Sequence, residues 1–281
     1  MPSRDRQLGQ DLAVAHRRIM DGLTRFIRLM RHTNYDEIAA AYDRRYTEED
    51  YSGIERALSA FVGDKSPKVL EVGCGTGHWL GQLQNRKINA IGIDLSRSML
   101  LRAREKLRGG SVIHARAENL PFADRTFDRV FCINAHHHFA DKLRFFEGAR
   151  RILRRGGSVM TVALDPHNGT DRWWVYEYFD GTREIDKERY PSCAQIREWM
   201  KTAGFTDTFT SEVQHLPGDA GAAEALLNGM VTPGHTSQLA VLTRDEFAAG
   251  VERIRAAIQS NSRLRLTADL RVYATYGRVA D

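Results

Sequence analysis

The chain of 281 residues contains no run of about 18 apolar residues, which argues against a membrane-spanning helix. Its first residues lack the apolar core of a secretion signal, and its three cysteines are not spaced as zinc ligands. Few and scattered cysteines fit a reducing compartment, so we expect a cytoplasmic protein with no metal site and no membrane association. The length suffices for one α/β domain with insertions.

Positive charge is in excess, with a net charge of +5. Much of the excess lies in residues 1–32, which hold seven arginines against three aspartates. A solvated helix face is the preferred interpretation of this basic segment. Binding of RNA or of an acidic metabolite stays open as the alternative.

A strand, a glycine turn and a helix are predicted between residues 67 and 85. Residues 69–72 form an apolar run typical of a strand that is buried on both faces. Glycines at positions 73, 75 and 77 then permit a tight turn. This layout points backbone N–H groups and a helix N-terminus at a ligand. No lysine follows the glycines, as a P-loop requires, and His78 replaces the third glycine of a dinucleotide fingerprint.

Four further segments follow in the order that a nucleotide-binding fold requires. The apolar run 90–94 ends in Asp94, 23 residues after Glu71. An acid at the end of the second strand accepts hydrogen bonds from ribose hydroxyls in such folds. A loop at 115–122, a fourth strand at 127–133 and a Gly-Gly turn before a fifth strand at 158–162 complete the series.

The pattern Glu71-x-Gly73-x-Gly75-x-Gly77, with the segments after it, resembles the class I S-adenosylmethionine (SAM)-dependent methyltransferases over residues 67–164. The resemblance implies an α/β, doubly wound, Rossmann-like sheet of seven mostly parallel strands with an antiparallel last strand. SAM would be the cofactor and S-adenosylhomocysteine its product. The implied cofactor-binding residues are Glu71, Gly73, Cys74, Gly75, Asp94, Leu95, Met99, Ala117, Glu118 and Asn134.

The segment 34–43 also resembles a phrase of small-molecule methyltransferases that closes over the methionine end of the cofactor. It adds Tyr35 and Tyr42 to the expected cofactor contacts. The segment 8–31 reads as an amphipathic helix that packs on the domain or on a homodimer partner, or that forms part of a cover. We therefore divide the chain into an N-terminal helical cap, residues 1–62, and a methyltransferase domain, residues 63–281.

Two insertions, residues 165–190 and 215–268, exceed a minimal fold of this kind. The first is rich in aromatic residues, among them Trp173, Trp174 and Tyr178. The second contains a helix predicted at 243–259 that opens with a capping box of Thr243 and Glu246. We expect both to form a helical cover on the acceptor side, between a sixth strand at 205–213 and a last strand at 270–277.

Three histidines follow the predicted fourth strand directly. Methyl transfer from a sulfonium is an in-line displacement, so the protein must chiefly align the acceptor in a dry site. An oxygen or nitrogen acceptor can also require a base, and His136, His137 and His138 are the candidates. His137 is preferred for acceptor contact and His138 for shaping the loop.

The sequence thus predicts a SAM-dependent methyltransferase that modifies N, O or C of a small-molecule acceptor. DNA-amine methyltransferases carry Asp/Asn-Pro-Pro-Tyr/Phe after the fourth strand, whereas this chain has Asn134-Ala135-His136-His137, so a nucleic-acid partner is disfavoured. The alternatives are an RNA methyltransferase, which the basic N-terminus would suit, and a non-catalytic SAM-binding partner subunit, whose glycine motif is often eroded. A third alternative, a nicotinamide-dependent oxidoreductase, is disfavoured because His78 replaces the third glycine of the dinucleotide fingerprint.

Overall fold

The structure is a computed structural model that describes residues 43, 46, 50–65, 67–109 and 111–281. The helix predicted at 8–31, and the segment 34–43 with Tyr35 and Tyr42 but without its last residue, lie outside the described residues. The division into a cap at 1–62 and a domain at 63–281 therefore stays a prediction. Among the described helices, none combines the length and the apolar character needed to cross a membrane.

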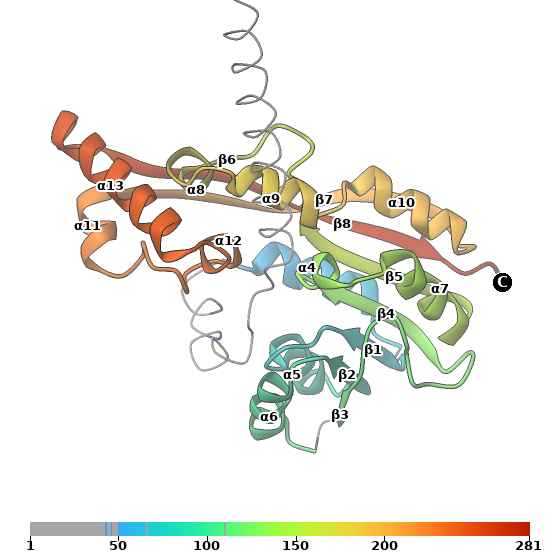
Figure 1. Ribbon diagram of the computed structural model, residues 1–281. Coiled ribbons are helices and arrows are strands. Elements are labelled where there is room, and N and C mark those ends of the chain that lie inside the picture. The colour runs from blue at the N-terminus through green and yellow to red at the C-terminus, as the bar shows by residue number, and fades with distance from the viewer. Residues whose placement is uncertain (1–42, 44–45, 47–49, 66, 110) are drawn as a thin grey trace, which may run out of the picture.

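A mixed sheet runs through the molecule in the order β3-β2-β1-β4-β5-β8-β6, and β7 pairs with β8 (Figure 1). Neighbours among the first five strands are parallel, and β8 is antiparallel to its neighbours β5, β6 and β7. The strands are β1 (Val69–Val72), β2 (Ala90–Asp94), β3 (Ser111–His114), β4 (Phe127–Ile133), β5 (Leu153–Leu164), β6 (Arg172–Trp173), β7 (Thr206–Gly221) and β8 (Arg265–Arg278). The doubly wound, mostly parallel sheet is confirmed, with eight strands where seven were expected, because the two-residue β6 also pairs with β8.

Helices cover both faces of this sheet, because successive side chains of each strand point to opposite sides. Leu70 and Val72 pack into one hydrophobic core, whereas Val69 packs into the other. The helices that flank the parallel strands are α4 (Ser52–Val62), α5 (His78–Asn85), α6 (Arg97–Lys106), α7 (Lys142–Ile152) and α10 (Cys193–Thr202). Residues 52–62, grouped with the N-terminal cap from the sequence, contribute Ile54 and Leu58 to the second core.

The antiparallel strands β7 and β8 are much longer than the strands expected at 205–213 and 270–277. They pair from Thr206 and Arg278 as far as Gly221 and Arg265, well beyond the end of β5. The strand was expected to end at 213, because Pro217, Gly218 and Gly221 belong to residue types that are depleted in strands. We call the outer part of this pair, residues 214–221 and 265–272, the arm.

The arm carries a group of helices drawn from both insertions (Figure 1). We call residues 172–189 and 222–260 the insertion subdomain. Its helices are α8 (Trp174–Tyr178), α9 (Thr182–Arg189), α11 (Ala222–Leu227), α12 (Ser237–Ala240) and α13 (Arg244–Ser260). The capping box predicted at the start of α13 is confirmed by both of its hydrogen bonds.

The insertion subdomain has a hydrophobic core of its own. Trp174 and Phe179 of the first insertion pack there with Leu239 and Ile254 of the second. A Cβ atom at Gly250 would lie 2.2 Å from the Phe179 ring, so this glycine lets the ring approach the α13 backbone. The two insertions, far apart in sequence, therefore form one packed unit.

Candidate active site

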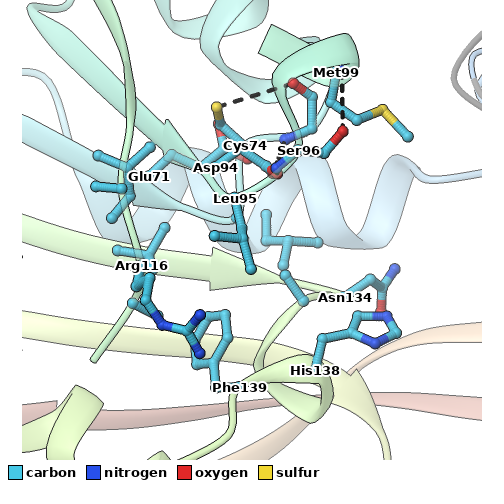
Figure 2. A pocket seen from close by; sticks show the side chains of 18 of the residues that line it. Glu71, Cys74, Asp94, Leu95, Ser96, Met99, Arg116, Asn134, His138 and Phe139 are labelled. Carbon is cyan, nitrogen blue, oxygen red and sulfur yellow. Dashed lines mark hydrogen bonds between the residues drawn. The ribbon is translucent and has the colours of Figure 1, made fainter. Parts of the chain in front are cut away.

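A cavity of about 340 Å³ lies at the carboxyl ends of β1, β2 and β4 (Figure 2). Doubly wound sheets bind ligands at this edge, and the volume falls within the range of roughly 300–1,000 Å³ for ligand pockets. Every predicted cofactor residue in the described part of the chain lines it: Glu71, Gly73, Cys74, Gly75, Asp94, Leu95, Met99, Ala117, Glu118 and Asn134.

The glycine turn after β1 forms one wall of the cavity and is tied to β2. The backbone N–H groups of Gly73 and Cys74 both donate to the Ile93 carbonyl, at 2.8 and 2.9 Å. Gly73 has a φ of 78°, and a Cβ atom there would lie 2.4 Å from the Cβ atom of Ala135. Glycine is thus required both by the backbone angle and by the close approach of the turn after β4.

Asp94 at the end of β2 is held by the backbone on both oxygens. The Gly75 N–H donates to Oδ2 and the Ser96 N–H donates to Oδ1, each at 2.8 Å. Burial raises the pKa of this carboxyl, and these hydrogen bonds offset part of that effect. Because a carboxylate oxygen has two lone pairs, each oxygen keeps one for a ligand hydroxyl.

Glu71 places a second, almost wholly buried acid at the cavity. The side chain is 1% exposed, and among the described residues its Oε2 atom has no hydrogen-bond partner. Burial, and then the charge of Asp94, raise the pKa of this carboxyl well above its usual range. A buried carboxyl without a donor is costly, so this atom is suited to a hydrogen-bond donor or a cation supplied by a ligand.

The loop 115–118 forms a further wall of the cavity. Glu118 Oε1 accepts a hydrogen bond from the Ala140 N–H at 2.7 Å, and Arg116 approaches Oε2 at 3.5 Å. The Glu118 side chain therefore braces the loop against the start of α7. Ala117 and the loop backbone remain as the surface that faces the cavity.

Sequence reasoning missed several lining residues. Tyr46 lies before α4, and its ring stacks on His78 with centroids 3.7 Å apart, next to Trp79. Most of the other missed lining residues are direct neighbours of predicted ones or lie in the turn after β4: Val72, Ile93, Ser96, Arg116, Ile133, Ala135 and Phe139. Trp79 of α5 and Ala115, at the start of the loop after β3, complete the lining.

The three histidines form a single turn of 3₁₀-helix, η2 (His136–His138). His138 lines the cavity, as does Asn134 (Figure 2). His137 is not among the lining residues and stacks instead on the Tyr190 ring at 3.9 Å. His136 is buried, and within the described chain neither of its ring nitrogens has a hydrogen-bond partner.

Both buried histidines are neutral at pH 7. Burial, and then the charge of Lys142, lower the pKa of His136 to about 3. Burial, and then the neighbouring charges of His138 and Arg189, hold the pKa of His137 well below its ordinary value. Within the described residues, no three His, Cys, Asp or Glu side chains come together as a metal site.

The fold and this cavity define an α/β protein that binds a nucleotide-like ligand at the switch point of its sheet. Comparison with known proteins narrows the class. Residues 70–161 match the family of the methyltransferase domain. Demethylmenaquinone methyltransferase of Thermotoga maritima is 33% identical over 202 residues, which is 62% of this chain and 87% of that protein.

Two further similarities are also to methyltransferases. Malonyl-[acyl-carrier protein] O-methyltransferase of Pectobacterium atrosepticum is 29% identical over 154 residues, 54% of this chain and 60% of that protein. The fold resembles phosphoethanolamine N-methyltransferase 2 of Haemonchus contortus, solved with phosphomonomethylethanolamine and S-adenosylhomocysteine. There the TM-score is 0.56 and the identity 20%, over 90% of this chain and 59% of that one. The chain belongs to the class I SAM-dependent methyltransferases and is an enzyme of that family.

Proposed function

We propose that the cavity binds SAM and that the enzyme transfers its methyl group to N, O or C of a small-molecule acceptor. The observation that carries this proposal is the meeting of two acids, the buried Glu71 and the half-buried Asp94, with the glycine turn in one cavity. When bound, SAM supplies a methyl group that is already activated by the positive charge on sulfur.

The lining residues suit the parts of this cofactor. Asp94 keeps one free lone pair on each oxygen for the two ribose hydroxyls. Glu71 Oε2, buried and without a donor among the described residues, accepts from the amino group. Leu95 lines the cavity yet is 56% exposed, so it offers an apolar surface that the adenine would cover, beside Ala117.

The acceptor end of the cavity lies at the turn after β4. Asn134 and His138 line it there, whereas His137 is occupied by its stack with Tyr190. We assign the role of base to His138 in place of His137, for an acceptor that must lose a proton. For an acceptor that is already nucleophilic, alignment alone suffices, and His138 then shapes the site.

A small acceptor is supported by the relatives of the chain. The relatives named above are methyltransferases of demethylmenaquinone and of malonyl-[acyl-carrier protein], and a rice relative is a hydroquinone methyltransferase. An RNA acceptor would rest on the basic segment 1–32, which is outside the described residues. An intact cavity argues against a non-catalytic subunit. The cytoplasmic location and the homodimer stay predictions.

Calorimetry and mass spectrometry test the proposal together. S-adenosylhomocysteine and SAM should bind the full chain, and NADH should bind far more weakly. Incubation with a metabolite extract and SAM carrying an isotope-labelled methyl group should yield a labelled small molecule whose mass identifies the acceptor. Tighter binding of NADH, or label found only in RNA, would contradict the cofactor and the acceptor class respectively.

A further inference from the structure

A second polar cluster lies behind the histidine turn, away from the cofactor cavity. His138 lines the cavity, and the His137 ring packs against it with centroids 3.9 Å apart. The Tyr190 ring stacks on the His137 ring as well, with centroids 3.9 Å apart, and the Arg189 guanidinium carbon lies 6.0 Å from the Tyr190 ring centroid. Two ring layers thus connect the proposed acceptor end of the cavity to a charged group at the end of α9.

Arg189 is nearly buried and yet holds open hydrogen-bond donors. Its side chain is 12% exposed. Both terminal nitrogens, Nη1 and Nη2, are buried and find no hydrogen-bond partner in the described part of the chain. The paired carboxylate, Asp186, approaches only to 3.9 Å, which is beyond hydrogen-bond distance. The charge of the guanidinium is therefore compensated by Asp186, whereas its two terminal nitrogens have no hydrogen-bond acceptor among the described residues.

Asp186 is prevented from closing this gap because other groups hold it. The Tyr176 hydroxyl and the Gln238 amide both donate to its Oδ2 atom, at 2.7 and 2.9 Å. Its Oδ1 atom faces Arg189 and, within the described residues, accepts no hydrogen bond. These partners come from α8 and α12, so both insertions fix the position of the acid. The open donors of Arg189 are a property of the assembled insertion subdomain.

We propose that Arg189 binds an anionic group of the methyl acceptor, a carboxylate or a phosphate, through its open Nη1 and Nη2 donors. The planar fork of a guanidinium matches two oxygens of such a group. The positive charges of Arg189 and Lys142 both act on His137, which favours an anion on this side of the turn. The inference rests on the proposed function, since it assigns a chemical class to the acceptor of that reaction.

Small aromatic anions provide the test, because the Tyr190 and His137 rings border the site. Calorimetry of the full chain, with and without saturating S-adenosylhomocysteine, would use benzoate, phenyl phosphate and the neutral benzamide. Saturable binding of at least one anion, at least tenfold tighter than that of benzamide, is expected. Arg189→Met should weaken the anion at least tenfold, and Arg189→Lys should weaken it less. Arg183→Met is the matched control, because Arg183 is on the same helix but stacks over Tyr176.

A second variant, with the opposite expected effect, excludes misfolding as the explanation for weaker anion binding. Asp186→Asn removes the competing charge beside Arg189 and should tighten anion binding about threefold or more, which damage to the fold would not do. Anion binding that is absent in the wild type, equal in Arg189→Met, or unchanged in Asp186→Asn overturns the proposal. If S-adenosylhomocysteine binds and the anions do not, the inference alone fails. If S-adenosylhomocysteine does not bind, the proposed function fails, whatever the anions do.

Discussion

The cofactor cavity and the insertion subdomain hold their polar side chains in different ways. At the cavity, Asp94 is fixed by backbone N–H groups of two neighbouring turns, Gly75 and Ser96. In the insertion subdomain, Asp186 is fixed by side chains of two other helices, Tyr176 and Gln238. The terminal nitrogens of Arg189 have no hydrogen-bond partner among the residues that the structure describes. The first arrangement depends on the local chain path, and the second on how distant segments pack.

This difference indicates how the two regions divide the work. A site built from backbone groups needs few particular side chains. This suits a cofactor that stays the same whatever the acceptor is. A site built from side chains on separate helices changes when any of those residues changes, which suits recognition of one particular acceptor. We therefore expect substitutions at the cavity to alter cofactor affinity, and substitutions in the insertion subdomain to alter acceptor recognition or subdomain stability.

The largest effect is expected where the two regions meet, at the histidine turn. If His138 is the base, His138→Ala should lower kcat by roughly 10²–10⁴-fold with S-adenosylhomocysteine affinity retained. His137→Ala, the matched control, should lower kcat much less, because His137 stacks on Tyr190 away from the cavity. Steady-state rates with the identified acceptor would decide.

The opposite ranking would return the base role to His137. In that case the rate should also persist well below pH 6.5, because the pKa of His137 is lowered by burial. Normal kcat in both variants would mean that the acceptor needs no base, and the family assignment would stand.

Trp174 tests whether the insertion subdomain is a separate unit. Its side chain is fully buried in the subdomain core, so Trp174→Ala should reduce the free energy of unfolding by about 3–5 kcal/mol. S-adenosylhomocysteine affinity should remain within about twofold, since the core around the cavity is not altered. Urea unfolding and calorimetry measure the two quantities. Trp173→Ala, at a half-buried position, serves as the milder control, and a parallel loss of cofactor affinity would show that the regions act as one.

Asp186 should make the stability of the insertion subdomain depend on pH. Burial raises the pKa of this carboxyl from 3.8 to about 6, so the native state keeps the proton where the unfolded chain has lost it. Its stabilising contribution is present below about pH 4 and is lost as the pH rises through about 6. The stability of Asp186→Asn relative to wild type should therefore increase by about 2 kcal/mol between pH 4 and pH 7. A difference that stays constant in urea unfolding across this range would argue that Asp186 is charged throughout.

Gly73 tests the backbone-built side of the comparison. Gly73→Ala places a Cβ atom against Ala135 at a positive φ, so we expect about 100-fold weaker binding of S-adenosylhomocysteine. Gly63 is a matched control, because its φ is 69° but nothing lies within 4 Å of an added Cβ. Gly63→Ala should cost about 1–3 kcal/mol of stability and leave affinity unchanged. Equal affinities in the two variants would show that the close approach to Ala135 does not matter.

The smallest effect is expected for Asp94. Asp94→Ala should weaken S-adenosylhomocysteine by about 1.5–3 kcal/mol, the range for hydrogen bonds to a charged group. Asp186→Asn, an acid substitution in the other region, should leave this affinity unchanged. If calorimetry gives the Asp94 variant wild-type affinity, the carboxylate does not hold the ribose and serves only to brace Gly75 and Ser96.

The cavity could be predicted from the sequence because its determinants are local. Glycines after β1 and the acid after β2 lie at fixed offsets from short apolar runs, and the strand edge brings them together. The choice among the histidines could not be predicted. A 3₁₀-helix has about three residues per turn, so three successive side chains point in three directions. His136 points into the protein, His137 to Tyr190 and His138 to the cavity.

The arm and the polar cluster of Arg189, Asp186 and Gln238 could not be predicted from the sequence either. Pro217 and Gly218 interrupt the alternation that would have extended β7, and its partner β8 supplies the pairing that sustains it. Arg189, Asp186 and Gln238 were not singled out from the sequence, because no motif contains them. Their burial depends on packing between segments about 50 residues apart.

Cys74 lies in the glycine turn and lines the cavity proposed for SAM. An ionised thiol at that position would be a nucleophile beside an alkylating agent, and the enzyme would risk methylating itself. Burial, and then the charges of Glu71 and Asp94, raise the pKa of the Cys74 thiol well above its ordinary value. Since the thiolate is the reactive form of cysteine, the acids that suit the cofactor's amino group and ribose also keep this sulfur inert toward it.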